Sequence, residues 1–258
     1  KLVETPHLGM EHQSAVAYGN HFMNGYLGSD LSGTGWGLKW DYIIVHESGH
    51  EWFGNNITAK DLADMWIHEG FTCYSESLFV ESQYGKQAAQ EYIHGMRNDI
   101  ANKSPVVGVY GVNKEGSEDM YYKGSVLLNM VRTIINNDDK WRNILRGLNK
   151  TFYHQTVTYD DIINYINQQS GINLSTVFDQ YLRYTGLPTL QITWQNGKPF
   201  CKWIADAQGF NMPVKIRIKG GDYKFITPTT SLKPLDMPGA TAGNLEAVPL
   251  TIISNSRG

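Results

Sequence analysis

The chain has 258 residues, a formal net charge of −3 and 41% hydrophobic residues, which allows one large domain or one domain plus a smaller one, with a sizeable core. Lys and Arg do not cluster, which argues against a nucleic-acid-binding face, and no apolar run approaches the roughly 18 residues that span a bilayer. The two cysteines, Cys73 and Cys201, form no disulfide framework and leave the compartment undetermined. The first residues show neither an initiator Met nor a signal-peptide pattern, so we expect a piece of a longer polypeptide.

The first 35 residues are rich in Gly, Asn and Ser and contain no long periodic segment, so we expect mostly irregular structure there. The Gly-rich stretch from Asp30 to Gly37 has neither the G-x-G-x-x-G spacing nor that of a P-loop. It therefore indicates a flexible connection and no phosphate site.

A histidine motif of the form H-E-x-x-H follows, in His46-Glu47-Ser48-Gly49-His50. We expect a helix over residues 40–53, ended by residues 54–55, Gly and Asn, which tolerate left-handed backbone angles. Residues i and i+4 share a helix face, so His46 and His50 can hold one metal ion together, and Glu47 lies at the rim, where it could take a proton from an activated water. The apolar residues on both sides of the motif predict a buried helix. This argues against the alternative that the two histidines are solvated residues at the surface.

A second helix is expected over residues 64–84, with Gly85 as its stop. It carries Glu69, nineteen residues after His50, as a candidate third ligand. Two imidazoles and one carboxylate leave the fourth position of a tetrahedral zinc ion open, as catalytic zinc sites require. We therefore predict one Zn²⁺ ion held by His46, His50 and Glu69.

Other polar residues of this helix have open roles. Glu76 shares a face with Glu69, and either Glu76 or Asp64 could accept a hydrogen bond from a metal-bound histidine; the alternative for both is a solvated charge. Cys73 faces the same way, and we interpret it as a small buried thiol. We interpret His68 as a neighbour of the site and not as a fourth ligand.

Residues 86–101 predict another helix, and the Gly- and Pro-containing stretch 103–118 predicts a loop that walls a cleft. Met120-Tyr121-Tyr122-Lys123-Gly124 comes next, and a lone tyrosine is normally a packing residue. The remaining helices are expected at 123–137, 140–151, 159–168 and 174–184.

The pattern changes to alternation after Pro188. Strands are expected at 189–194, 214–219 and 248–253, with Asn196-Gly197 as a hairpin turn. We therefore expect a mixed α+β chain, with a mainly helical domain over residues 1–188 and a small β-sandwich domain over residues 189–258.

The pattern H-E-x-x-H-x18-E, with Glu51-Trp52-Phe53-Gly54-Asn55 after the second histidine, resembles the M1 family of zinc aminopeptidases, a family of gluzincins. The resemblance, to a bacterial-type member, runs from the first residues to about Pro188 and more faintly to the end. It implies that residues 1–188 form a thermolysin-like zinc peptidase domain that lacks its N-terminal part. It also implies further domains upstream and a role for Glu47 as the general base.

Two further motifs stand in the order that the family uses. Gly9-Met10-Glu11 matches the family's G-x-M-E-N strand, which lines the cleft. The glutamate of that strand binds the substrate's free α-amino group, and such a contact is charge-assisted. The chain departs from the motif at Leu8 and at His12, and we predict that His12 donates or accepts a hydrogen bond with bound peptide.

Tyr121 matches the tyrosine of the family's Y-x-K-G motif, which donates a hydrogen bond to the oxyanion of the tetrahedral intermediate; Tyr122 is its confusable neighbour. The resemblance thus implies a peptidase that removes N-terminal amino acids from peptides with a free N-terminus. One alternative is a thermolysin-like endopeptidase, against which Glu11 argues. Another is a zinc-containing binding module without turnover, against which Glu47 argues. A third alternative is the hydrolysis of a lipid epoxide, as in a bifunctional relative of the family. Nothing in the sequence points to it.

Overall fold

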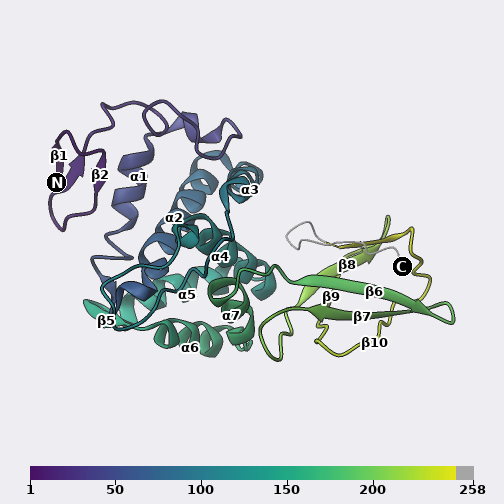
Figure 1. Cartoon of the computed structure of the whole chain (residues 1–258). Coiled ribbons are helices and arrows are strands. Elements are labelled where there is room, and N and C mark those ends of the chain that lie inside the picture. The colour runs from purple at the N-terminus through teal and green to yellow at the C-terminus, as the bar shows by residue number, and fades with distance from the viewer. Residues whose placement is uncertain (248–258) are drawn as a thin grey trace. The chain divides into compact units, whose positions relative to one another are not determined.

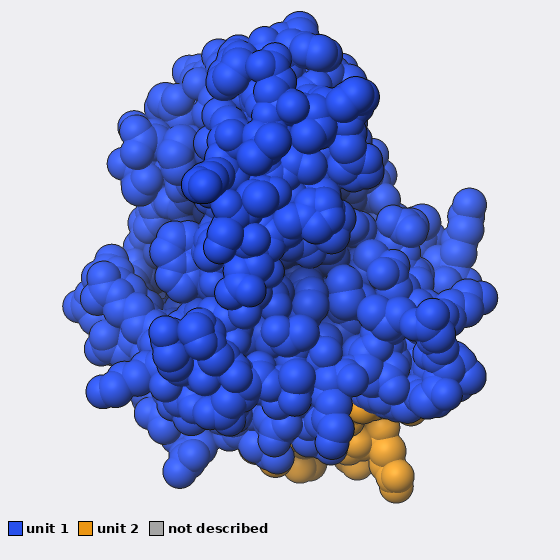
Figure 2. Space-filling model, turned by 90° about the vertical axis from the view of Figure 1, so that its left-hand side faces the viewer, with its two compact units in different colours: residues 1–170 blue, residues 171–258 orange. Residues whose placement is uncertain are grey.

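The computed structural model of the chain describes residues 1–247. These residues form helices and short strands (Figure 1). By compactness they divide into two units, residues 1–170 and the part from residue 171 onwards, which Figure 2 shows in blue and orange. Between residues 1 and 247, no helix combines the length and the apolar character that crossing a membrane requires.

The central helix of the first unit is α2 (Trp66–Tyr84), which packs against α1 (Tyr42–Gly49), α3 (Lys86–Gly95) and α4 (Tyr122–Ile135). Because neighbours cover it on several sides, nearly all residues of its first turns are buried. A helix buried nearly all round is a core helix, so the polar side chains that it carries need partners inside the protein. The other helices of this unit are α5 (Asp138–Thr151) and α6 (Tyr159–Ser170).

A small sheet lies beside α1. Its strands β1 (Leu2–Glu4), β3 (Val16–Tyr18) and β2 (Gly9–Met10) have the order β1-β3-β2, with β1 parallel and β2 antiparallel to β3. Both β2 and β3 contact α1 (Figure 1). Alternation of apolar and polar residues cannot be recognised in strands of two or three residues, so the sequence did not predict this sheet. The segment is therefore more regular than its composition indicated. A second pair, β4 (Ile57–Ala59) and β5 (Gln155–Val157), is parallel.

Helix α1 is shorter than predicted. It ends at Gly49, whereas the sequence predicted an end at residue 53. The amides of Glu51 and Trp52 bond to carbonyls three residues back, so the chain winds into tighter turns instead of continuing the helix. His50 is therefore the C-cap of α1 and not a residue inside it.

The other predicted helices of this unit are present with shifted bounds. α2 begins at Trp66, after a 3₁₀ turn over Leu62–Asp64, and the helix predicted at 86–101 is α3 followed by a 3₁₀ turn over Met96–Asp99. Asp61 caps the first of these turns by accepting the amide of Ala63 at 2.9 Å. The loop predicted at 103–118 is confirmed as irregular up to Ser117.

The second unit contains α7 (Ser175–Arg183) and two three-stranded sheets, of order β10-β7-β6 and β11-β8-β9. Asn196 and Gly197 have φ of 50° and 74°, the left-handed values of a two-residue hairpin turn, which confirms that prediction. The strand predicted at 248–253 lies outside the described residues. The strands are β6 (Thr189–Gln195), β7 (Lys198–Ile204), β8 (Val214–Ile218), β9 (Lys224–Ile226), β10 (Lys233–Pro234) and β11 (Leu245–Ala247).

Candidate metal centre and active site

Three ligand atoms from the end of α1 and the start of α2 meet at one point. Nε2 of His46 lies 3.2 Å from Nε2 of His50, and each lies 3.4 Å from Oε2 of Glu69. The edge of a tetrahedron is about 1.63 times the distance from its centre to a corner, so zinc bonds of about 2.0–2.1 Å place any two ligand atoms about 3.3–3.4 Å apart. The three observed separations therefore match the edges of a zinc tetrahedron.

The three ligand atoms are also all acceptors, so a positive charge between them would be stabilising. Nδ1 of His46 contacts Oε1 of Glu76 at 2.7 Å, and Nδ1 of His50 contacts the carbonyl oxygen of Phe53 at 2.9 Å. Both partners are acceptors, so each ring places a proton on Nδ1 and, when neutral, a lone pair on Nε2. Oε2 of Glu69 is buried and accepts no hydrogen bond from the described residues. Three facing acceptors are what a Zn²⁺ ion binds.

The ligand atoms of His46, His50 and Glu69 can bind protons as well as a metal ion, so their pKa values bear on metal binding. Burial alone would lower the pKa of His46, but its contacts with Cys73, Glu69 and Glu76 raise the pKa well above its ordinary value. Burial would likewise raise the pKa of Glu69, but contacts with His46 and His50 hold it at about 2, so Glu69 is a carboxylate. The residues present therefore fit a divalent cation, and its binding would displace protons.

His50 is held by the tight turn that follows α1. Besides the Phe53 carbonyl, the hydroxyl of Thr72 on α2 lies 3.2 Å from Nδ1 of His50 and 3.4 Å from that carbonyl oxygen. Gly54 completes the turn with φ of 136°, and a Cβ there would lie 3.3 Å from Nδ1 of His50. The turn therefore needs glycine for its backbone angle and for space. Sequence reasoning missed Thr72, because its contact depends on how α2 packs on the turn.

Glu76 orients His46, and Asp64 does not. Glu76 is fully buried, and its second oxygen accepts a hydrogen bond of 2.7 Å from the hydroxyl of Tyr92 on α3. Asp64 instead accepts hydrogen bonds from the hydroxyl of Tyr110 at 2.8 Å and from the first amide of α6 at 3.0 Å. The open choice between the two acids is thus resolved in favour of Glu76, which holds the ring of His46 as carboxylates commonly hold metal ligands.

We expect Glu76→Gln to weaken zinc binding about 10–100-fold, because the amide can no longer act as a charged acceptor for Nδ1 of His46. Competitive titration of the metal-free protein with zinc and a chelating dye would measure this. Glu81→Gln is the control on the same helix, since Glu81 pairs with Arg132 and not with the site. Equal zinc affinities in the two variants would contradict the role given to Glu76.

Cys73 and His68 lie next to the cluster with other partners. The buried thiol of Cys73 lies within 4.8 Å of ligand atoms of His46 and Glu76, and burial raises its pKa, so it keeps its proton at neutral pH. Nε2 of His68 accepts a hydrogen bond of 2.7 Å from the amide of Ala59, and burial lowers the pKa of this ring. Neither residue supplies a free ligand atom to the point where the three acceptors meet.

Glu47 is buried at the edge of the same cluster. Its carboxylate lies within 4.8 Å of ligand atoms of Glu11 and His50, and burial raises its pKa to about 7 against the opposing effect of the two imidazoles. Strand β2 passes close by: a Cβ on Gly9 would lie 2.4 Å from Oε1 of Glu47. A carboxylate whose pKa lies near the working pH suits a group that accepts and returns a proton.

Glu11 follows β2 and lies close to Glu47 and His50. Its Oε1 lies 4.0 Å from Nδ1 of His50, and its carbonyl accepts a hydrogen bond of 3.0 Å from the side-chain amide of Asn55. Met10 and His12, on either side of it, are exposed. The structure thus brings Glu11 to the ligands and leaves His12 at the surface, where its contact with peptide stays a prediction.

Tyr121 lies just before α4 and faces the site. Its ring centroid is 6.2 Å from that of His46, and no described residue hydrogen-bonds its hydroxyl. Burial and the nearby Glu69 carboxylate raise its pKa, so the hydroxyl remains a donor. Tyr122 packs instead against the hydrophobic core between α1, α2 and α3. The two adjacent tyrosines therefore face different surroundings, and only Tyr121 is free to donate into the site.

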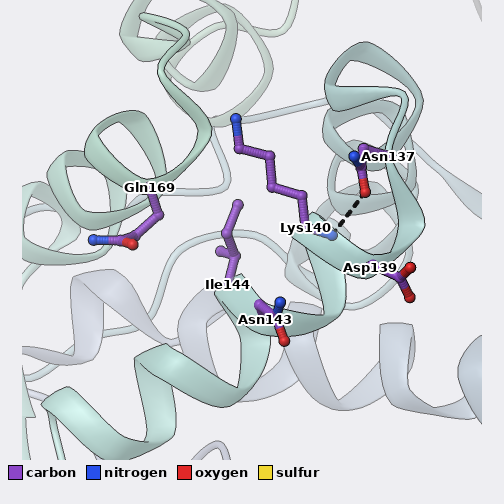
Figure 3. A pocket seen from close by; sticks show the side chains of 6 residues that line it. All are labelled: Asn137, Asp139, Lys140, Asn143, Ile144 and Gln169. Carbon is purple, nitrogen blue, oxygen red and sulfur yellow. Dashed lines mark hydrogen bonds between the residues drawn. The ribbon is translucent and has the colours of Figure 1, made fainter.

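A separate pocket of about 390 Å³ shares no residue with this cluster (Figure 3). The Asn137 side chain accepts the amide of Lys140 as the N-cap of α5, and Nζ of Lys140 donates to the carbonyl of Ser170. These polar groups serve helix ends. The lining residues are Asn137, Asp139, Lys140, Asn143, Ile144 and Gln169.

Comparison with known proteins gives aminopeptidases among the relatives. Human endoplasmic reticulum aminopeptidase 1 is 29% identical over 237 residues, which cover 82% of this chain and 24% of that protein. The rat protein of the same name is 32% identical over 127 residues, 45% of this chain and 14% of that protein. Aminopeptidase N of Lactococcus lactis is 26% identical over 164 residues, 57% and 19% of the respective lengths. The chain thus spans less than a quarter of the length of these relatives.

Solved structures share the fold. Legionella pneumophila aminopeptidase A, in complex with aspartic acid, has a TM-score of 0.64 at 17% identity and covers 92% of this chain and 28% of its own. An M1 zinc metallopeptidase from Deinococcus radiodurans has a TM-score of 0.58 at 20% identity, covering 72% and 39%. The family model described as "Peptidase family M1 domain" matches residues 4–181, more than half of the chain. The chain therefore belongs to peptidase family M1.

Proposed function

We propose that this chain is the catalytic part of a zinc aminopeptidase, which removes N-terminal amino acids from peptides. The observation that carries the proposal is the meeting of His46, His50 and Glu69 at zinc-ligand spacing, with Glu47 and Glu11 at the same place. Membership of the M1 family and the aminopeptidases among the relatives support it. In this proposal residues 1–188 are the thermolysin-like catalytic domain, and residues 189–258 are a small β-sandwich domain.

The proposed chemistry divides among the chain's own residues. When bound by His46, His50 and Glu69, zinc would polarise the scissile carbonyl and acidify a water molecule. Glu47 takes the proton of the attacking water and delivers it to the leaving amine. Tyr121 donates its hydroxyl hydrogen to the oxygen that becomes negative in the tetrahedral intermediate.

The place of Glu11 favours release of a single residue. In a peptide, the α-amino nitrogen and the first carbonyl carbon are separated by one Cα, which puts them about 2.5 Å apart. Ligand atoms of Glu11, Glu47 and His50 lie within 4.8 Å of one another, so an ammonium bound to Glu11 would bring the first peptide bond close to Glu47 and the metal ligand His50. An endopeptidase with the same ligands has no use for a carboxylate that receives an N-terminus.

Activity should follow the free amino terminus. We expect hydrolysis of amino-acid amides and unblocked peptides, and little hydrolysis of the same peptides after N-acetylation. Glu11→Gln should raise KM for unblocked substrates with a smaller effect on kcat, because the amino group is bound in the ground state and in the transition state alike. Steady-state kinetics on a panel of amino-acid amides measures both. Equal cleavage of blocked and unblocked peptides would identify an endopeptidase, and absence of any cleavage by a zinc-loaded chain would identify a binding module.

Tyr121→Phe should lower kcat about 10²–10³-fold, the usual effect of losing one donor to an oxyanion. KM should change less, because the oxygen carries little charge before attack. Tyr122→Phe is the matched control, since the neighbouring ring packs into the core. If both variants kept nearly full turnover, another group would be the donor.

A further inference from the structure

A carboxylate links the small sheet to helix α1. Asp41 is the N-cap of α1, and its Oδ1 accepts hydrogen bonds from the Ile44 amide at 3.2 Å and from Nδ2 of Asn20 at 2.8 Å. Its Oδ2 accepts the hydroxyl hydrogen of Tyr18. Tyr18 and Asn20 are fully buried, and Asp41 is half-buried. We call Tyr18, Asn20 and Asp41 the Asp41 network.

The two ends of the network lead to the two halves of the active site. Tyr18 is the last residue of β3 and pairs with Gly9 of β2, two residues before Glu11. Asp41 starts the helix that carries His46 and Glu47. The position of Glu11 relative to the metal ligands therefore depends on how the sheet sits on α1. The Asp41 network is a polar link between the sheet and the start of α1, and the Asn55 side chain links the Glu11 carbonyl to the turn after α1.

The same network holds a strained loop. The side chain of Asn20 donates to the carbonyls of Met23 and Gly25 at 2.8 and 2.9 Å and accepts the amide of Leu27 at 2.7 Å. The Tyr18 hydroxyl also accepts an amide of this loop at 2.7 Å. Left-handed backbone outside glycine costs roughly 1–2 kcal/mol per residue and persists where the surroundings fix it. The loop residues with left-handed φ other than glycine are His21, Phe22 and Leu27.

We propose that Tyr18 and Asp41 are positioning residues for the substrate's amino terminus, because they fix β2 on α1 and so place Glu11 beside the metal centre. The proposal rests on the proposed aminopeptidase function. A displacement of about 1 Å at a bound group can cost about 10²-fold in rate or binding, so the loss of a hydrogen bond on the strand next to β2 can affect substrate binding at Glu11. Burial and the Asp41 carboxylate raise the pKa of Tyr18 to about 12, which keeps its hydroxyl a donor throughout the working range.

The test is a double-mutant cycle between Tyr18→Phe and Glu11→Gln. Tyr18→Phe removes one hydroxyl and keeps the buried ring. It should raise KM for L-leucine amide about tenfold or more and weaken binding of L-leucine by calorimetry, with kcat and zinc content less changed. In the Glu11→Gln background, the same substitution should add little to either value, since a residue that acts through Glu11 has nothing left to position. Tyr84→Phe is the control, because the Tyr84 hydroxyl bonds to the Lys39 carbonyl close to α1 without joining the network.

Several outcomes decide the proposal. It is overturned if the effects of Tyr18→Phe and Glu11→Gln on KM and on leucine binding simply add, or if Tyr18→Phe lowers only the melting temperature. If Tyr18→Phe does not fold, Asp41→Asn replaces it in the cycle, because Asn is also a good N-cap but presents an amide group in place of the oxygen that accepts the Tyr18 hydroxyl. A wild-type chain that binds zinc and leucine but cleaves no peptide refutes the proposed function, while the leucine-binding cycle still tests the positioning role.

Discussion

Glu47→Gln is expected to lower kcat about 10²–10⁴-fold while leaving one zinc ion per chain. General acid–base catalysis contributes rate factors of this size, and glutamine can neither accept nor return a proton. Zinc content should persist because Glu47 is adjacent to His46 on α1 but does not supply one of the three meeting ligand atoms. Turnover of an unblocked amino-acid amide, with metal analysis of the same sample, measures both quantities.

The control for this variant is Glu51→Gln. Glu51 lies four residues further on, and its side chain is exposed, so the same chemical change should leave kcat within about twofold, as is usual for surface substitutions. Substantial turnover in a Glu47→Gln sample free of wild-type enzyme would contradict the assignment of the base.

Removal of zinc is expected to abolish turnover and to lower the melting temperature. Without the ion, the buried carboxylate of Glu69 faces two imidazoles with only protons to compensate it. A ligand that binds only the folded chain adds about 4 kcal/mol of stability when its free concentration is about 1,000 times Kd. Dialysis against a chelator, followed by calorimetry and by stepwise return of zinc, would show both losses and their recovery.

The matched sample for this experiment is Glu69→Gln. Glutamine keeps the size of the side chain but gives up the charged ligand oxygen, so this variant should bind zinc weakly and be nearly indifferent to the chelator. If the wild-type chain kept its turnover after chelation, the metal would have no part in the mechanism, and the proposed function would be wrong.

Local spacing explains what could be predicted of the site. His46 and His50 are one helical turn apart, so periodicity places them on one face, while Glu69 was a candidate ligand by its residue type and its spacing from His50. The residue types then select zinc. The roles proposed for Glu11 and Tyr121 come only from the family resemblance, because a single acid in a loop or a single tyrosine carries no pattern.

Tertiary contacts explain what could not be predicted. The choice of Glu76 over Asp64 depends on which face of α2 meets His46, and the contact of Thr72 depends on the turn after α1. The strands beside α1 have two or three residues, below the length at which alternation is visible. The network at Asp41 joins residues about twenty positions apart that share no motif.

The early end of α1 has a consequence for the dynamics of the metal centre. Because His50 caps the helix and is secured by the turn to Gly54, a local opening of that turn would carry one imidazole away while α1 stays wound. We therefore expect metal to exchange through a fluctuation of a few residues, without global unfolding. In hydrogen–deuterium exchange, the amides of residues 51–55 should be slowed by zinc more than those in the middle of α1.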